Sequence, residues 1–344
     1  MSDFLIIRLS SLGDIIHTLP AFGALRKNFP EAHIRWVVED KGKEILDCVP
    51  GIDRIVQAQT RKWSLFSKHF WSELKRIRRE IAQSDQMTFD FQGLLKSGFL
   101  AFLSKARKRA GFHKSNLKEP IAALFYTDRL DELSEDVHVI SKNLMLLTLT
   151  GIDEDKYEFP LLIEDSIEES TQNKLTDLGY SAPKKLVVLN IGAAWETKRW
   201  PAERWVELIH RLNQERSDLF FLLLWGNDTE KATALQIEKE TGVSTVPFLT
   251  IKEVMALVNK ANLLVSGDTF ALQVACAFAR PVVGIFGPTN PKRNGPFRSS
   301  DRVAFHELEC SHCYKRKCKV LACLNKISAE EVADLCQQSL GDNA

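Results

Sequence analysis

The sequence predicts an α/β protein with two Rossmann-like domains, whose parallel sheets face a central cleft. Three observations support this class. Apolar runs typical of buried strands alternate with helical stretches along the chain. A leading strand occurs twice, at residues 4–9 and 185–191, and each opens its own strand–helix series. An acidic and polar segment with two prolines, residues 158–185, separates the two series.

Each expected element rests on its own pattern. Strands are assigned to short apolar runs that end in small or turn-forming residues: 4–9, 33–39, 86–92, 185–193, 220–226, 244–248, 262–268 and 280–287. Helices are assigned to longer stretches around and between them: 19–28, 41–48, 68–83, 94–105, 136–148, 202–215, 229–241, 251–260, 269–278 and 328–339. The last helix begins with the capping-box pattern Ser328-x-x-Glu331.

The domain boundary is expected in the polar segment. We predict an N-terminal domain over residues 1–165 and a C-terminal domain over 166–327. A final helix is expected over residues 328–344, and packing against the first domain is one alternative for it. Ligands of such sheets bind at the carboxyl ends of the strands, so the loops there are where function is sought.

Composition bounds the class of protein. The chain has 344 residues and is 44% hydrophobic and 26% charged, as in ordinary soluble globular proteins. The net charge of +1 implies no global attraction to nucleic acid or membrane. No apolar run approaches the roughly 20 residues that span a bilayer, and the N-terminus lacks the pattern of a signal peptide. We therefore expect a cytoplasmic protein, with its seven cysteines reduced.

A carboxylate stands in the loop after the first strand. In "RLSSLGDIIHTLP", residues 8–20, Asp14 lies at or near the start of a helix. Helix N-terminal amides usually favour a bound phosphate there, but this loop supplies its own anion. Asp14 therefore suits removal of a proton from a substrate hydroxyl. The alternative is that Asp14 only caps the helix.

Two strand-end loops of the second half present polar residues before a helix. In residues 190–205, Lys198 and Arg199 suit a diphosphate, although a solvated surface pair is the alternative. In residues 224–231, Asn227 and Asp228 suit a sugar hydroxyl or simply a turn.

A third loop of the second half opens a helix with Asp268 and Thr269. Free amides at that helix start would attract an anion, and Asp268 could equally serve as the cap. The loop at 286–297, with two Gly-Pro pairs and one Asn-Pro, is a rigid turn region.

Basic residues concentrate in the first half. Residues 61–80 mix bases with four aromatic residues, and residues 104–118 add six more bases. Such a face suits an anionic amphiphile at a membrane surface or an acceptor that carries phosphates. Nucleic acid would also fit the charge, and a solvated helix face is the structural alternative. The aromatic residues are Trp63, Phe66, Phe70 and Trp71.

Three motifs together resemble the ADP-heptose:lipopolysaccharide heptosyltransferases, glycosyltransferase family 9. They are "RLSSLGDIIHTLPA", "GAAWETKRWPAERW" and "SGDTFALQVACAFARPVVGIFGPTNP". The segments "WVVED", "RKW", "DFQGLLKSG" and "KEPIAALFYTDR" are closest to the heptosyltransferase I branch. Each motif is weak alone, but their order and spacing hold over nearly the whole chain.

The resemblance implies a GT-B fold and an inverting, metal-independent transfer without a cofactor. The donor would be ADP-heptose and the acceptor a Kdo residue of Kdo-lipid A, at the cytoplasmic face of the inner membrane. Asp14 matches the catalytic base. Lys198, Asp268 and Thr269 match the donor site, to which Asp228 and Gln273 are added. The residues that match the acceptor contacts are Arg61, Lys62, Gln92, Lys96 and Lys118.

This chain departs from the family pattern on the donor side. Phe270 stands where members often have glycine, and Gln273 stands where they often have histidine. Glutamine still donates a hydrogen bond but cannot carry charge. Ala193 and Ala194 stand where the branch often has hydroxyl residues. These differences keep open a related transferase that uses another nucleotide sugar or a later core acceptor.

The segment "CSHCYKRKCKVLAC" holds Cys310, Cys313, Cys318 and Cys323. Four thiolates could bind a structural zinc ion, but the spacing is tighter than in the usual pair of knuckles. Inert or redox-labile thiols are the alternative. A catalytic metal is not expected.

Two functions of other classes compete with the enzyme. A non-catalytic nucleotide or lipid-head-group module with a GT-B shell is one, and the joint presence of Asp14, Lys198 and Asp268 argues against it. Nucleic-acid binding rests on the basic stretches alone, and we do not expect it.

Overall fold

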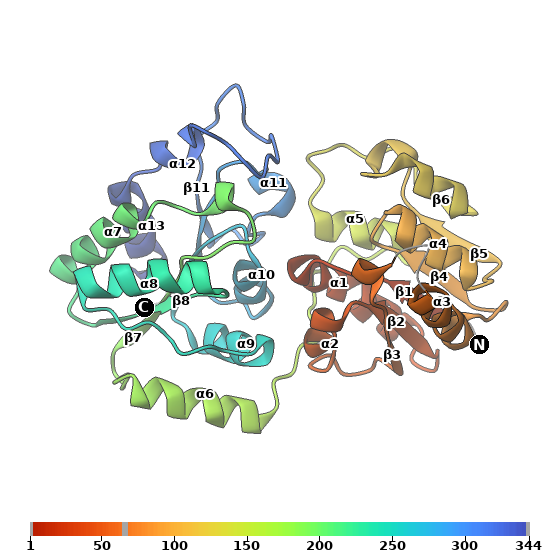
Figure 1. The fold of residues 1–344 in the computed structure, drawn as a ribbon, viewed down its shortest axis with the longest axis horizontal. Coiled ribbons are helices and arrows are strands. Elements are labelled where there is room, and N and C mark those ends of the chain that lie inside the picture. The colour runs from red at the N-terminus through yellow and green to blue at the C-terminus, as the bar shows by residue number, and fades with distance from the viewer. Residues whose placement is uncertain (1–2, 64–67, 342–344) are drawn as a thin grey trace. The chain divides into compact units, whose positions relative to one another are not determined.

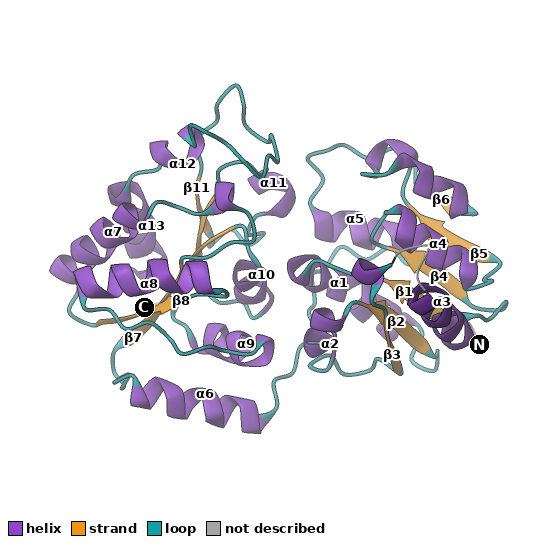
Figure 2. Cartoon of the chain, in the orientation of Figure 1, coloured by secondary structure: helices purple, strands orange, loops and turns teal. Residues whose placement is uncertain are grey.

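A computed structural model describes residues 3–63 and 68–341, without the side chains of residues 68 and 69. The chain divides into two compact units, the first ending at Leu162 and the second beginning at Ile163. Within the described residues, each unit has one parallel sheet with helices around it (Figures 1 and 2).

The first unit carries a sheet of six strands among its described residues, in the order β3-β2-β1-β4-β5-β6. The strands are β1 (Phe4–Ile7), β2 (Ile34–Val38), β3 (Arg54–Gln57), β4 (Met87–Asp90), β5 (Lys108–Gly111) and β6 (Asp128–Arg129). The helices are α1 (Leu12–Asn28), α2 (Asp40–Leu46), α3 (Lys68–Ile81), α4 (Leu95–Leu103) and α5 (Val139–Leu146). Short 3₁₀ helices are η1 (Thr60–Lys62), η2 (Lys114–Asn116), η3 (Pro120–Phe125) and η4 (Leu147–Thr150).

The strand order places a switch point between β1 and β4. From β1 the chain winds outward to β2 and β3, then returns to β4 on the other side of β1. The loops after β1 and β4 therefore diverge and leave room for a ligand at their carboxyl ends. The cluster beneath this sheet joins strand residues such as Leu5 and Ile7 to Ile77 of α3 and Leu100 of α4, all fully buried. On another side, α1 packs against α2 and α5 (Figure 1).

The second unit carries a sheet of five strands among its described residues, in the order β11-β10-β9-β7-β8. The strands are β7 (Lys185–Asn190), β8 (Leu219–Leu224), β9 (Leu263–Gly267), β10 (Val282–Ile285) and β11 (Arg302–Ala304). The helices are α6 (Asp165–Asp177), α7 (Ala202–Glu215), α8 (Asp228–Thr241), α9 (Ile251–Lys260), α10 (Phe270–Ala277), α11 (Pro291–Asn294), α12 (Ala322–Lys326) and α13 (Ala329–Gly341), with a 3₁₀ turn η5 (Glu196–Lys198). Here the switch point lies between β7 and β9.

Several elements differ from the sequence-based expectation. Helix α1 begins at Leu12 and not at 19, because Pro20 lies inside the helix and does not start it. The polar segment before β7 contains the helix α6, of which only Thr171 and Leu175 are buried. The expected strand at 244–248 is reduced to an isolated bridge between Leu223 and Thr245.

The final helix belongs to the second unit. Helix α13 packs against α7, β9, β10 and β11, and it buries Val332, Ala333 and Cys336. Its apolar face is thus used within its own unit. Ser328 Oγ accepts a hydrogen bond from the Glu331 N–H, as the capping pattern predicts. Within the described part of the chain, none of the helices combines the length and apolarity needed to cross a membrane.

Candidate functional site

Asp14 lies in the first turn of α1, just beyond the carboxyl end of β1. Its Oδ1 is 2.8 Å from Nη2 of Arg8, and its Oδ2 accepts hydrogen bonds from Ser11 N–H (3.1 Å) and Ser11 Oγ–H (2.9 Å). The carboxylate therefore does cap the helix start, which is the structural alternative. The side chain is nevertheless 33% exposed, and each carboxylate oxygen can accept more than one hydrogen bond.

The charge of Asp14 is fixed by its surroundings. Burial within the protein acts to raise the pKa of the carboxyl group. The charges of Arg8 and His17 and the hydrogen bonds from Ser11 lower this pKa and outweigh the effect of burial. The pKa consequently lies below its ordinary value of 3.8. Asp14 is therefore ionised at neutral pH and ready to accept a proton.

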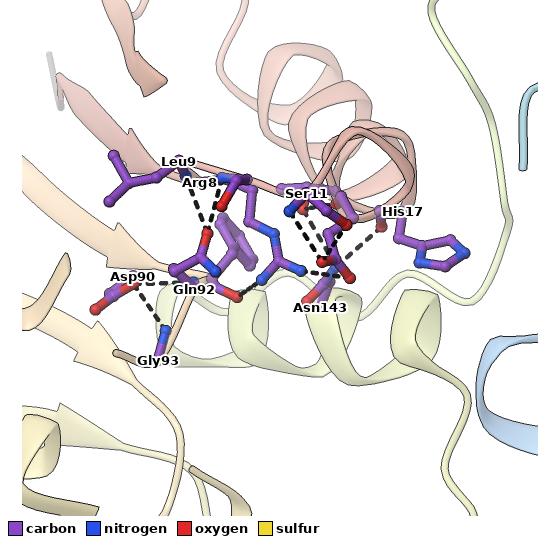
Figure 3. A network of polar contacts seen from close by, with 12 residues as sticks. Arg8, Leu9, Ser11, His17, Asp90, Gln92, Gly93 and Asn143 are labelled. Carbon is purple, nitrogen blue, oxygen red and sulfur yellow. Dashed lines mark hydrogen bonds and ion pairs between the residues drawn. The ribbon is translucent and has the colours of Figure 1, made fainter. Parts of the chain in front are cut away.

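Arg8 links the loop after β1 to the loop after β4 (Figure 3). Its guanidinium donates through Nη1 to the carbonyl of Phe91, and its own carbonyl accepts from Trp36 Nε1 at 3.3 Å. Gln92 closes the link, since its Oε1 accepts from the N–H groups of Leu9 and Ser10, both at 3.1 Å. The two loops that flank the switch point thus hold each other and Asp14.

A buried carboxylate supports the second of these loops. Asp90 ends β4 and accepts hydrogen bonds from Tyr126 Oη–H (2.7 Å), Ser97 Oγ–H (2.8 Å), and the N–H groups of Gln92 (2.9 Å) and Gly93 (3.1 Å). Burial raises the pKa of Asp90 despite these donors. Its side chain is fully buried, so its role is to shape the loop that carries Gln92.

The predicted acceptor residues of the first unit fall into two groups. Arg61 pairs with Glu39 at 2.7 Å, and Lys96 Nζ donates to the carbonyl of Thr60, whose hydroxyl donates to Glu39. Lys62 Nζ lies 3.2 Å from Gln59 Oε1 in the same turn. The structure thus gathers Arg61, Lys62 and Lys96 around η1, while Gln92 stands beside Arg8.

Lys118 lies apart from those residues, exposed just before η3. Its neighbour Leu117 lies against the loop after β4, with its side chain 2.7 Å from where a Cβ on Gly93 would stand. Of the four predicted aromatic residues, Trp63 donates to Glu73 at 3.1 Å and contacts Phe70 edge to face, and Trp71 is 59% exposed. Phe66 lies outside the described residues.

Lys198 and Asp268 meet at the switch point of the second unit. The Nζ of Lys198 is 2.6 Å from Oδ2 of Asp268 and 4.4 Å from the ring centre of Trp195. Lys198 comes from the loop after β7, and Asp268 follows β9 directly. Gly267 permits this approach, because a Cβ there would lie 2.9 Å from the Lys198 carbonyl oxygen.

Thr269 is the N-cap of α10, with its hydroxyl oxygen accepting from Leu272 N–H at 3.5 Å. Asn190 Nδ2, at the end of β7, also donates to this hydroxyl at 2.9 Å. Gln273 is 2% exposed and donates through Nε2 to the carbonyl of Asn294 at 2.8 Å. Its Oε1 is buried without a hydrogen-bond partner, so an acceptor remains available next to this loop.

At the carboxyl end of β8 the structure reveals a carboxylate that sequence reasoning missed. Asn227 caps α8, accepting from Glu230 N–H at 3.1 Å, and Asp228 is exposed. Glu230 is 6% exposed and accepts from Gly226 N–H at 2.8 Å, while Arg199 pairs with it at 3.2 Å. Gly192 is the feature of the sequence that could have pointed to this carboxylate, because a Cβ at position 192 would lie 2.2 Å from Glu230 Oε2.

The cysteine segment does not form the four-thiolate site that we considered. Among the described residues, no group of three or more histidine, cysteine or acidic side chains is arranged to hold a metal ion. Cys318 is exposed, and hydrogen bonds from the N–H groups of Val320 and Leu321 lower the pKa of its thiol. Cys323 lies nearer to Cys310 and Cys313, and burial and those two neighbours raise the pKa of its thiol.

Comparison with known proteins identifies the family. A model of glycosyltransferase family 9 (heptosyltransferase) matches residues 74–323. Lipopolysaccharide heptosyltransferase 1 of Pseudomonas aeruginosa is 28% identical over 321 residues, 91% of this chain and 86% of that protein. The protein of the same name from Escherichia coli K12 is 28% identical over 304 residues, 87% of this chain and 92% of that protein.

The fold agrees with the same family. The solved structure of E. coli heptosyltransferase WaaC with ADP-2-deoxy-2-fluoro heptose superposes with a TM-score of 0.75 at 25% identity, covering 99% of this chain and 100% of that one. The two units, each with one parallel sheet, therefore form the GT-B fold of these enzymes. Because the family model spans well over half of the residues, the chain belongs to glycosyltransferase family 9.

Proposed function

We propose that this protein is an inverting heptosyltransferase that transfers L-glycero-D-manno-heptose from ADP-heptose to a Kdo residue of Kdo-lipid A. The observation that carries the proposal is the Arg8–Asp14 pair at the switch point of the first sheet. Relatives named lipopolysaccharide heptosyltransferase 1 and the WaaC structure with an ADP-heptose analogue support this donor and this acceptor.

Asp14 acts as the general base. Its carboxylate receives the proton of an acceptor hydroxyl while that oxygen forms a bond to the anomeric carbon of the heptose. The bond from the anomeric carbon to the ADP oxygen breaks at the same time, and its electron pair leaves with ADP. Attack on the face opposite the leaving group inverts the anomeric configuration. Arg8 keeps Asp14 ionised, and Ser11 holds its orientation.

The second unit binds the donor. Lys198 offsets the negative charge that develops on the leaving diphosphate, assisted by the free amides at the start of α10 next to Thr269. Asp268 holds Lys198 in place and has oxygens for a sugar hydroxyl. The buried carboxylate of Glu230 and the exposed carboxylate of Asp228 stand at the end of β8, where they suit ribose hydroxyls. Gln273 offers its unpartnered Oε1 as a further acceptor.

The first unit binds the lipid-linked acceptor. Arg61, Lys62 and Lys96 supply cations around η1, and Gln92 and Lys118 flank the loop after β4. These charges suit the carboxylate of Kdo and the phosphates of lipid A. A lipid acceptor places the protein at the cytoplasmic face of the inner membrane as a peripheral protein.

One experiment separates this function from its alternatives. The purified protein is incubated with Kdo-lipid A and, in parallel, with ADP-heptose, other ADP-sugars and UDP-sugars, and the products are weighed by mass spectrometry. Addition of one heptose from ADP-heptose alone is the expected result. Transfer from a different nucleotide sugar would support the related family 9 transferase, and donor binding without any product would support the non-catalytic module.

A further inference from the structure

An exposed apolar ridge covers α4 and η3 in the first unit. Four large hydrophobic side chains of these two elements are strongly exposed: Leu95 45%, Phe102 54%, Ile121 63% and Leu124 81%. The two elements pack against each other, and the rings of Phe102 and Phe125 lie 6.1 Å apart. Contiguous apolar surface of this kind usually marks an interaction site.

The spacing of the exposed apolar residues places them on one face of each element. In α4, Leu95 and Phe102 are seven residues apart, which places them on one helix face with the half-buried Phe99 between them. In η3, Ile121 and Leu124 are three residues apart, which is one turn of a 3₁₀ helix. The outward face of both elements is therefore apolar along its length.

The inward faces carry the small residues. A Cβ on Gly98 would lie 2.9 Å from the Phe125 ring and 3.1 Å from the carbonyl oxygen of Ala122. Within η3, Ala122 and Ala123 are the buried residues. Helix α4 still anchors itself in the core through Leu100, but an ordinary surface helix would not also expose large apolar residues such as Leu95 and Phe102.

The charges beside the ridge indicate what kind of partner it fits. Lys114 and Lys118 precede η3, and Lys105 follows α4; all three are exposed. The acid at the ridge, Glu119, accepts the Leu95 N–H at 2.7 Å and thereby holds the start of α4. Apolar side chains with lysines at both ends of the ridge match a bilayer surface that contains anionic lipids.

We propose that the α4–η3 ridge is the surface by which this protein docks on an anionic membrane. The apolar side chains enter the boundary between head groups and acyl chains, and the lysines contact anionic head groups. The choice of a lipid surface rests on the proposed function, in which the acceptor is a membrane lipid. The ridge adds the place of contact and its lipid preference.

The test compares two double variants by co-sedimentation with vesicles of phosphatidylethanolamine and phosphatidylglycerol. Ile121→Asp with Leu124→Asp should lower the partition coefficient about tenfold or more, because two exposed apolar side chains are lost and two like charges face the lipid. Leu235→Asp with Val320→Asp changes two other exposed residues, 48% and 70% accessible, and should leave it within about twofold. Higher salt and vesicles of phosphatidylcholine alone should weaken binding of the unaltered protein.

Each contrary result has its own meaning. The proposal is overturned if the ridge variant binds vesicles as well as the unaltered protein does. It is also overturned if light scattering shows that the unaltered protein is a dimer and the ridge variant a monomer, because the ridge would then contact a second copy of the chain. Turnover on deacylated, water-soluble Kdo acceptor should be the same in the ridge variant and the unaltered protein. If neither the unaltered protein nor the ridge variant transfers heptose, but the ridge variant binds vesicles more weakly than the unaltered protein, only the proposed function fails.

Discussion

Nη2 of Arg8 lies 2.8 Å from Oδ1 of Asp14, and the Arg8 side chain is only 8% exposed. The same guanidinium donates to the carbonyl of Phe91 in the loop after β4. The position of Asp14 is therefore set by both loops that flank the switch point of the first sheet. A carboxylate that served only as a helix cap would need no such second support.

Replacement of Arg8 by methionine should raise the pKa of Asp14 and remove the ion pair that positions its carboxylate. Arg8 lowers the pKa of Asp14 while burial raises it, so loss of the cation raises that pKa. We expect turnover at pH 7 to fall about tenfold or more because Asp14 is no longer held in position. The acidic limb of the kcat/KM profile should move to higher pH because the pKa is raised. Arg8→Lys keeps the charge and should move the limb less. Profiles of both variants that coincide with that of the unaltered protein would show that Arg8 does not act on Asp14.

The low pKa of Asp14 also predicts how stability depends on pH. Because the folded-state pKa is below the ordinary 3.8, the unfolded chain binds this proton more readily. The stabilisation is present above that value and is lost as the pH falls through the folded-state pKa. Urea unfolding should show a difference in unfolding free energy between the unaltered protein and Asp14→Ala at pH 7 that shrinks towards pH 3. A difference that grows with acidity would contradict the assigned direction.

Lys198→Ala should impair donor use. Lys198 is the cation placed beside Asp268 and the start of α10, and removal of one such group from a developing anion typically costs about 10²–10³ in kcat. Lys239→Ala, which removes an exposed lysine from the last turn of α8, is the matched control and should have little effect. Steady-state kinetics with ADP-heptose as the varied substrate measures both, and equal activity of the two variants would remove Lys198 from the site.

Gly192→Ala should displace the Glu230 carboxylate. The new Cβ would stand 2.2 Å from Oε2, so Glu230 must leave the Gly226 N–H and Arg199. We expect a loss of about 1–3 kcal/mol in unfolding free energy and a raised KM for the donor. Gly23→Ala in α1 makes the same substitution where the nearest neighbour is 3.5 Å away. That control should be neutral or stabilising, and a tolerated Gly192→Ala with unchanged KM would contradict the role of Glu230.

Much of the site was predictable because its residues stand at strand ends. Asp14, Lys198, Asp268 and Thr269 each follow an apolar run and precede a helix, a pattern visible within about a dozen residues. Their partners were not predictable in this way. Arg8 belongs to the end of a strand, and its direction towards Asp14 and Phe91 appears only when β1 and β4 are side by side. Glu230 lies inside the first turn of α8, hidden under Gly192.

The missed elements share a physical cause. Strands β3, β5 and β6 are short and carry charged residues at exposed positions, so no apolar run reveals them. Helix α6 buries only two of its side chains and therefore has the composition of a linker. The cysteine spacing left both a structural zinc site and inert or redox-labile thiols open. Among the described residues no group is arranged to hold a metal ion, and Cys318 is exposed.

The most direct test of the central claim is the turnover of Asp14→Asn with ADP-heptose and Kdo-lipid A, measured together with its affinity for ADP-heptose. Asparagine keeps the size of the side chain and can still accept from Ser11, but it cannot take the proton. The account predicts a loss of about 10²–10⁴ in kcat with donor affinity unchanged. Near-normal turnover would contradict it and leave Asp14 as a helix cap.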